Sequence, residues 1–240
     1  MKTNEGNHVD IENVTDGVDL IEDEIELFVQ QQYIDFSKKI DFDSYDYKQV
    51  LKEGEKLFSE DTAFETKQII LLRLAHLGTI DSYRTIERYL RLPENNLRDW
   101  ALLSLKECGM FLQNSFLSEE GGLLSTGLGG KGNKLRYYFV LRTKKGLPFS
   151  EKDRDMMHKV FKMIARQFES DIEELFLEKN YAMVKILIPM DVAVGTVIDE
   201  GIIECNKKQE FLAPSYYVTN VKKPTNEEIM LYLEEAEREC

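Results

Sequence analysis

A glycine-rich stretch at residues 118–134 (SEEGGLLSTGLGGKGNK) separates two regions whose apolar residues follow different periods. Before it, apolar residues recur every three to four positions, which is the spacing of helices. After it, residues 135–142 (LRYYFVLR) have the aromatic and branched side chains that are typical of a strand. We therefore predict an α+β chain with a flexible acidic leader (1–17), a helical repeat-like domain (18–117), a linker (118–134) and a small α/β domain (135–240).

The region before the linker contains amphipathic patterns near 20–32 and at about 47–58, 62–77, 81–90 and 97–108. Two segments align without a gap at an offset of 31 residues: ETKQIILLRLAHLG (65–78) and NLRDWALLSLKECG (96–109). The second begins with a polar pair, Arg98-Asp99, followed by the small Ala101. In these features residues 47–112 resemble the HEAT-repeat family, which implies helical hairpins with a groove. An ordinary helical bundle with two leucine-rich helices is the alternative.

Trp100 is the single tryptophan of the chain and aligns with Ile69 in the other segment. Its neighbours Leu97, Ala101 and Leu103 supply an apolar helix face. We expect Trp100 in the core of the helical region.

The region after the linker alternates strand and helix patterns. Strands are expected at 135–142, 181–188 and 211–221, and helices at about 150–176, 191–205 and 225–239. This β-α-β-α-β-α order predicts a three-stranded sheet, and the helix between the first two strands favours a parallel crossover. A ferredoxin-like arrangement is the alternative.

Charge is concentrated at the start of the chain. The net charge is −13, and residues 1–46 hold 13 Asp and Glu against three Lys. Such an acidic front disfavours nucleic acid and anionic membranes as partners of that half of the chain and is compatible with a basic protein partner. No signal peptide or membrane-spanning run is visible, and three scattered cysteines suit a reducing cytoplasm.

The glycine stretch is the candidate ligand loop. Backbone amides and two ammonium groups within 127–134 suit a phosphate, and the residues concerned are Gly129, Gly130, Lys131, Gly132 and Lys134. The order does not fit a phosphate-binding loop, since no G-K-[ST] leads into a helix. A hinge between two domains is therefore preferred to a nucleotide-binding enzyme that uses this loop.

A basic run follows the glycines: residues 131–145 contain six Lys and Arg and no acid. On the expected strand Arg136, Tyr138 and Arg142 share one face, which makes them candidates for an interaction surface. This face could stack and neutralise a nucleic acid strand, or it could bind the acidic N-terminal segment of the same chain.

No set of residues has the spacing of a metal site or a catalytic motif, and no cofactor or metal is expected. The sequence therefore favours a non-enzymatic interaction or adaptor protein with a protein partner, which could be basic. Neither nucleic acid nor a membrane is expected as a partner. A phosphate- or nucleotide-binding enzyme is the alternative.

Overall fold

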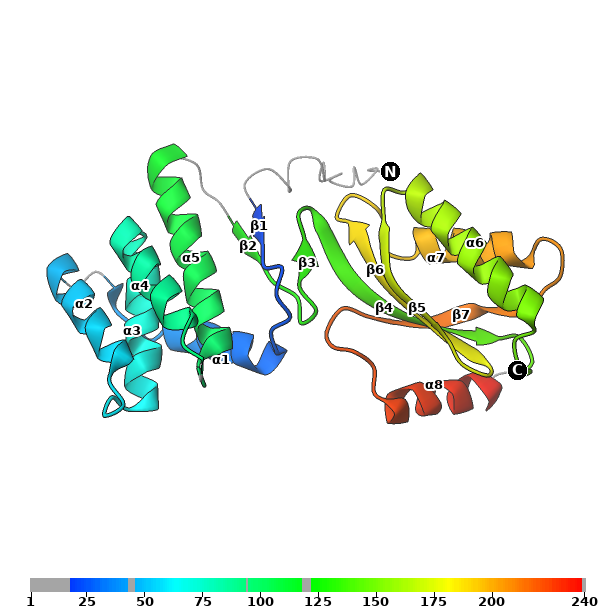
Figure 1. The fold of residues 1–240 in the computed structure, drawn as a ribbon, viewed down its shortest axis with the longest axis horizontal. Helices are drawn as coiled ribbons and strands as arrows, with labels where there is room; N and C mark the ends of the chain where they lie inside the picture. The colour runs from blue at the N-terminus through cyan, green and yellow to red at the C-terminus, as the bar shows by residue number, and fades with distance from the viewer. Residues whose placement is uncertain (1–17, 43–45, 94, 118–121, 239–240) are drawn as a thin grey trace, which may run out of the picture.

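The computed structural model describes residues 18–42, 46–93, 95–117 and 122–238. Figure 1 shows a helical region and a sheet domain side by side, with short strands between them. The prediction of an α+β chain is confirmed. Within the described residues, no helix is both long and apolar enough to cross a membrane.

The described part of the helical region contains five helices and one 3₁₀ turn. They are α1 (Leu27–Ser37), α2 (Tyr47–Gly54), η3 (Glu55–Phe58), α3 (Phe64–Leu77), α4 (Ile80–Leu90) and α5 (Arg98–Leu117). The buried side chains of α3 and α5 form most of the core, among them Leu71, Leu72 and Leu74. Helix α3 ends at Gly78, whose left-handed φ of 55° is one that glycine adopts without strain.

Trp100 lies in this core with 2% of its surface exposed, as predicted. Its indole Nε1 donates a hydrogen bond to the backbone oxygen of Gln68 at 3.2 Å. The rings of Tyr33 and Phe36 meet it edge-on, with centroids 5.1 and 5.5 Å away. The single tryptophan thus joins α1, α3 and α5.

Two short strands connect the two regions. Strand β1 (Val18–Leu20) pairs in parallel with β2 (Gly122–Leu124), so one strand lies inside the range expected to be helical. Residues 22–24, here called the acidic strap, follow β1 and run along the glycine-rich stretch. The backbone N–H of Gly130 donates to the Glu22 oxygen at 3.3 Å. A Cβ at Gly129 would lie 2.4 Å from the backbone oxygens of Glu22 and Asp23, so a larger residue does not fit there.

The sheet domain contains β3 (Gly130–Lys131), β4 (Lys134–Thr143), α6 (Glu151–Gln167), β5 (Asp171–Leu177), β6 (Tyr181–Pro189), α7 (Thr196–Asn206), β7 (Leu212–Thr219) and α8 (Asn226–Arg238). Its strands are all antiparallel in the order β5-β6-β4-β7, with β3 beside the start of β4. From β4 to β7 the elements follow the β-α-β-β-α-β order of the ferredoxin-like alternative. The predicted three-stranded sheet with a parallel crossover is wrong.

The error lies in β5, which was expected to continue the helix before it. Helix α6 ends at Gln167, and Glu169 turns the chain with a positive φ of 51°. A bulge between Ile172 and Glu174 then shifts the alternation of β5 by one residue. Ile172 and Leu175 consequently face the same side although they are three residues apart, a spacing that imitates a helix.

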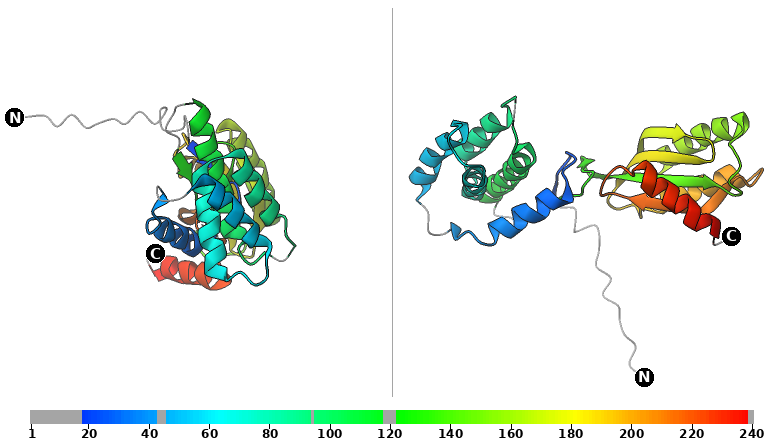
Figure 2. Two further views of the ribbon diagram at one scale, coloured as in Figure 1. Left: turned by 90° about the vertical axis from the view of Figure 1, so that its left-hand side faces the viewer. Right: turned by 90° about the horizontal axis from the view of Figure 1, so that it is seen from below.

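Both faces of the sheet are covered by helices. Helices α6 and α7 pack on one face, around Phe139, Phe161 and Val184. Helix α8 packs on the other face, against Tyr138, Val140 and Met183. Figure 2 shows the same layers, with α8 on the opposite side of the sheet from α6 and α7.

Candidate functional site

Three of the six basic residues of the run lie on β4, and acids of the same chain pair with two of them, Lys134 and Arg136. Arg136 makes a two-pronged contact with Glu173, at 2.7 Å from Nε and 3.0 Å from Nη2. Its Nη1 donates to the backbone oxygen of Leu128 at 2.7 Å and of Glu22 at 3.3 Å. The hydrogen bonds from Arg136 lower the pKa of the Glu173 carboxyl.

Two lysines complete this group, which we call the strand cluster (Lys134, Arg136 and Lys185). Lys185 lies 3.4 Å from Glu24 of the acidic strap and 3.7 Å from Glu173. Lys134 pairs with Asp171 at 2.6 Å. Within the basic run, Arg136 contacts the acidic N-terminal segment at a backbone oxygen of Glu22, whereas the ion pair to that segment is made by Lys185, outside the run.

The other two surface candidates are not on the surface. Tyr138 is 3% exposed and Arg142 is 8% exposed, because α8 packs on this face of the sheet. Arg142 interacts with Tyr232 of that helix. The expectation of an exposed aromatic beside basic side chains is wrong, since the sequence does not show that α8 covers this face.

The five candidate ligand residues lie in and beside the β3–β4 hairpin. Gly129 and Gly130 are buried, and Lys131 and Lys134 are register partners in the ladder. The backbone N–H of Gly132 donates to the Oε1 atom of Glu22 at 2.9 Å. In this arrangement an amide of the glycine stretch binds a carboxylate from the acidic strap.

A second basic surface lies on α6, and no sequence motif indicated it. Residues 156–168 contain four basic side chains and no acid. We call these side chains the α6 row: His158, Lys159, Lys162 and Arg166. Ser150 and Asp153 form a capping box at the start of α6. Met157, Phe161 and Ile164, on the inner face of the helix, are buried in the core and hold the helix against the sheet.

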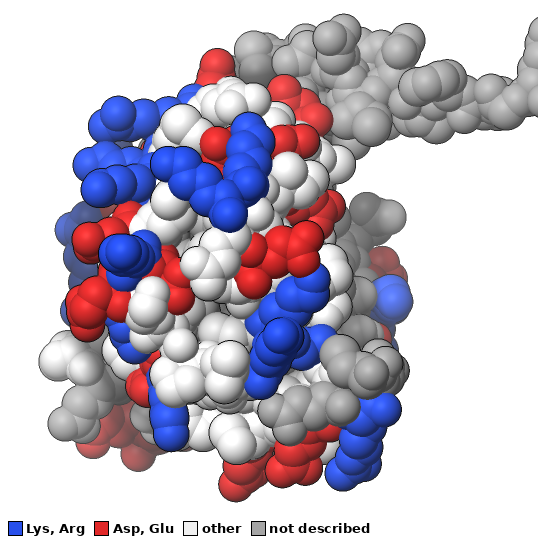
Figure 3. All heavy atoms as spheres, turned by 90° about the vertical axis from the view of Figure 1, so that its right-hand side faces the viewer, with Lys and Arg blue, Asp and Glu red and all other residues white. Residues whose placement is uncertain are grey.

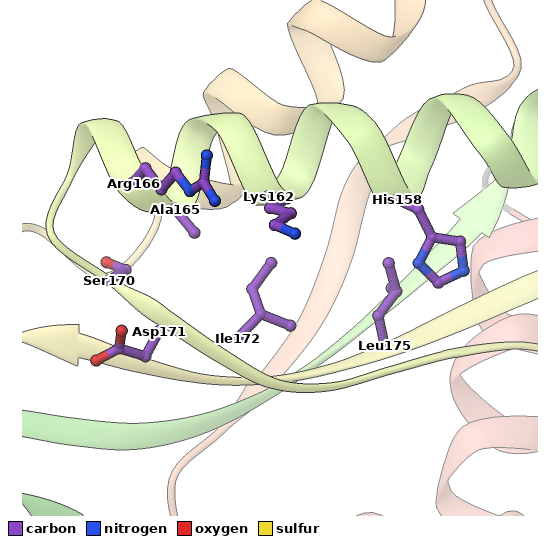
Figure 4. A pocket seen from close by; sticks show the side chains of 8 residues that line it. All are labelled: His158, Lys162, Ala165, Arg166, Ser170, Asp171, Ile172 and Leu175. Atoms are coloured by element: carbon purple, nitrogen blue, oxygen red, sulfur yellow. The ribbon is translucent and has the colours of Figure 1, made fainter.

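Three residues of the α6 row (His158, Lys162 and Arg166) line a groove of about 340 Å³ between α6 and the edge strand β5. Figure 4 shows Lys162 and His158 extending from the helix toward β5 and Arg166 at the end near Ser170. Ala165, Ile172 and Leu175 give the groove an apolar floor, and Ser170 and Asp171 line its strand side. The cations therefore stand on one wall of a concave surface.

Within the described chain, the α6 row gathers basic residues without a counter-charge on one helix, a property that single lysines elsewhere in the domain, such as Lys131 and Lys179, share. Among the described residues, none of its four side chains forms an ion pair or a side-chain hydrogen bond. Six other basic residues within 131–223 do form ion pairs: Lys134, Arg136, Lys144, Lys185, Lys207 and Lys222. In the end-on view of Figure 3, Lys and Arg gather at the upper left, whereas lower down they alternate with Asp and Glu.

The chemistry that this groove offers is anion binding. Unpaired ammonium and guanidinium groups attract phosphates and carboxylates, and a concave wall concentrates their field.

Within the described residues, no group of His, Cys, Asp or Glu side chains could hold a metal ion. The burial of Cys205, near α6, raises its thiol pKa to about 12, so it is no nucleophile.

The chain matches no protein-family model and no curated protein. Two solved structures are similar in part. One is assigned as a transposase from Deinococcus radiodurans, with 18% identity, 44% of this chain and 93% of that chain covered, and a TM-score of 0.39. The other is a REP-associated tyrosine transposase bound to a REP hairpin, with 8% identity, 43% and 67% covered, and a TM-score of 0.33.

These findings contradict the prediction of a non-enzymatic adaptor for a protein partner, because both similar structures are those of transposases. They also contradict the expectation that nucleic acid is no partner, since one of them is bound to a REP hairpin. Neither prediction is kept. With TM-scores below 0.5, the two matches assign neither an activity nor a site to this chain, whose function has to be argued from its own residues.

Proposed function

We propose that the sheet domain binds nucleic acid through phosphate contacts of the α6 row. The observation that carries the proposal is the acid-free row of basic side chains without counter-charges among the described residues, three of which (His158, Lys162 and Arg166) line one groove while Lys159 lies beside them on the same helix. By contrast, Arg136 and Lys185, which lie under the acidic strap, are already paired with carboxylates.

The geometry of the row suits a linear polyanion. His158, Lys162 and Arg166 are spaced by four residues, so each lies about 6 Å further along the helix axis than the last. The row therefore presents basic side chains along about 12 Å of groove, with the Lys162 ammonium and the Arg166 guanidinium about 6 Å apart along the axis. A single carboxylate or free phosphate would use only part of it, whereas successive phosphates of a nucleic acid backbone can contact each cation in turn.

The charge distribution supports a site on this domain despite the acidic chain. Residues 131–223 hold 17 Lys and Arg against 13 Asp and Glu, a net +4 within a chain of −13. The excess of acid lies in the helical region and in the last helix, where residues 224–240 hold six acids and one Arg. A polyanion is thus steered toward the body of the sheet domain and away from the rest of the chain.

The test compares two triple variants that remove the same charge. One replaces the unpaired cations of α6 (Lys159→Gln, Lys162→Gln and Arg166→Gln). The control replaces three paired cations elsewhere in the domain (Lys144→Gln, Lys207→Gln and Lys222→Gln). Binding to fluorescent single-stranded and duplex DNA of equal length is measured by anisotropy at low salt.

We expect the α6 variant to bind at least one of the two DNAs roughly tenfold more weakly than wild type, because it loses three phosphate contacts. The control should lose far less, since its lysines already have partners. Equal losses in the two variants, or binding of neither DNA by the wild-type protein, would reject the proposal. Preferential binding of an acidic peptide over DNA would assign the row to a protein ligand instead.

A further inference from the structure

A second cavity, in the helical region, contains a carboxamide to which no described residue forms a hydrogen bond. It has a volume of about 270 Å³ and lies between α1, α3 and the start of α5. Gln68 lines it and is 5% exposed, yet its side chain has no hydrogen-bond partner among the described residues. The Gln68 carboxamide is not among the fully buried polar atoms that lack a partner, so its nitrogen and oxygen remain accessible for a ligand.

Gln68 is held in a fixed place. Its backbone oxygen accepts the hydrogen bond of the Trp100 indole at 3.2 Å, and Trp100 itself lines the cavity. The helix around Gln68 packs against α5 through buried side chains such as Leu71 and Leu72. The carboxamide is therefore presented to the cavity by a rigid wall, as a preformed pair of one acceptor and one donor group.

An exposed aromatic ring lies one turn away. Phe64 precedes Gln68 by four residues on α3, so the two share one side of the helix. Phe64 lines the same cavity with 47% of its surface exposed, and Gln32 and Asn96 add two further exposed carboxamides. An apolar ring face beside a carboxamide is the combination that recognises an unpaired base, by stacking and by edge hydrogen bonds.

We infer that this cavity binds an adenine base. A glutamine carboxamide matches adenine through two hydrogen bonds, one donated to N7 and one accepted from the N6 amino group. Arg98, the cation among the described lining residues, already pairs with Asp23 at 3.5 Å and Asp99 at 3.7 Å. A free cation for a phosphate is therefore lacking in this part of the described chain, and the ligand is a nucleoside or a base and not a nucleotide. The inference does not depend on the α6 row.

The experiment uses the fluorescence of Trp100, the only tryptophan, as the signal of binding. Adenosine is titrated against three matched ligands: inosine, which replaces the 6-amino group by an oxygen; 7-deazaadenosine, which lacks N7; and ribose, which lacks the base. We expect adenosine to change the fluorescence saturably, and inosine and 7-deazaadenosine to bind on the order of tenfold more weakly.

Two variants identify the residues. Gln68→Leu should abolish the preference for adenosine over 7-deazaadenosine, and Phe64→Ala, at an exposed position, should weaken both. Gln113→Leu, an exposed glutamine of α5 outside the cavity, is the matched control and should bind as wild type. Equal binding of adenosine, inosine and ribose, or no response to adenosine in folded wild-type protein, overturns the inference. DNA binding by the α6 row is measured separately and is unaffected by either result.

Discussion

The strand cluster and the α6 row contain similar side chains in opposite electrostatic settings. In the strand cluster, Arg136 and Lys185 are covered by Glu173 and by the acidic strap, with 13% and 16% of their side chains exposed. In the α6 row, the cations have no counter-charge among the described residues. The first arrangement contributes to stability and the second is free to bind, so basic composition alone does not identify a binding surface.

The contrast between the strand cluster and the α6 row is tested most directly at Arg136. Arg136→Ala leaves the half-buried carboxylate of Glu173 and the backbone oxygen of Leu128 without their donor. We expect the free energy of unfolding to fall by about 2–4 kcal/mol, as for a partly buried ion pair that loses one partner. Urea denaturation followed by circular dichroism measures the change. A loss below about 0.5 kcal/mol, the range of ordinary surface substitutions, would show that the strand cluster is a surface feature.

The pH dependence of stability distinguishes the two settings in a second way. Hydrogen bonds from Arg136 lower the pKa of Glu173 below its ordinary value of 4.5. The depressed carboxyl therefore stabilises the fold above pH 4.5, and this contribution is lost as the pH falls through the lowered pKa. Wild type should lose stability over that acid range, and Glu173→Gln should lose less. Parallel pH profiles for the two proteins would contradict the pairing.

A smaller effect is expected at the turn that ends α6. Glu169 adopts a φ of 51°, a left-handed conformation that costs a residue with a side chain roughly 1–2 kcal/mol. Glu169→Gly should raise the free energy of unfolding by about 1 kcal/mol, because glycine adopts this conformation freely, as at Gly78. Glu178→Gly, at a residue without a positive φ, is the control and should not stabilise the protein.

The smallest effect on stability is expected in the α6 row itself. Lys162→Gln and Arg166→Gln remove no ion pair or hydrogen bond among the described residues, so the free energy of unfolding should change by no more than about 0.5 kcal/mol for each. Circular dichroism melts of the single variants test this. A large destabilisation would mean that the row supports the fold, and the contrast with Arg136 would disappear.

Much of the fold was predictable from local patterns. The α+β class, the change of period across the glycine stretch and the burial of Trp100 follow from residues close together in sequence. Strand β5 was missed because its bulge brings Ile172 and Leu175 to one side and so imitates a helix. The covering of Tyr138 and Arg142 depends on where α8 packs, which no local pattern encodes.

The candidate site was less predictable, for a related reason. The run 131–145 looked like the basic surface because it contains no acid, yet its partners Glu22, Asp171 and Glu173 are far away in sequence. The α6 row was not recognised as basic from the sequence because Glu151, Asp153 and Asp155 precede it on the same helix and offset its charge. An acid-free segment within the last turns of a capped helix is the signal that could have found it.

The salt dependence of DNA binding tests the central claim, that the unpaired cations of α6 contact phosphates. If Lys159, Lys162 and Arg166 each neutralise one phosphate, the logarithm of the binding constant should fall with the logarithm of salt concentration with a slope of about −2 to −3. The triple α6 variant should lose most of this slope, and the Lys144, Lys207 and Lys222 control should keep it. Equal slopes for wild type and the α6 variant would contradict the account.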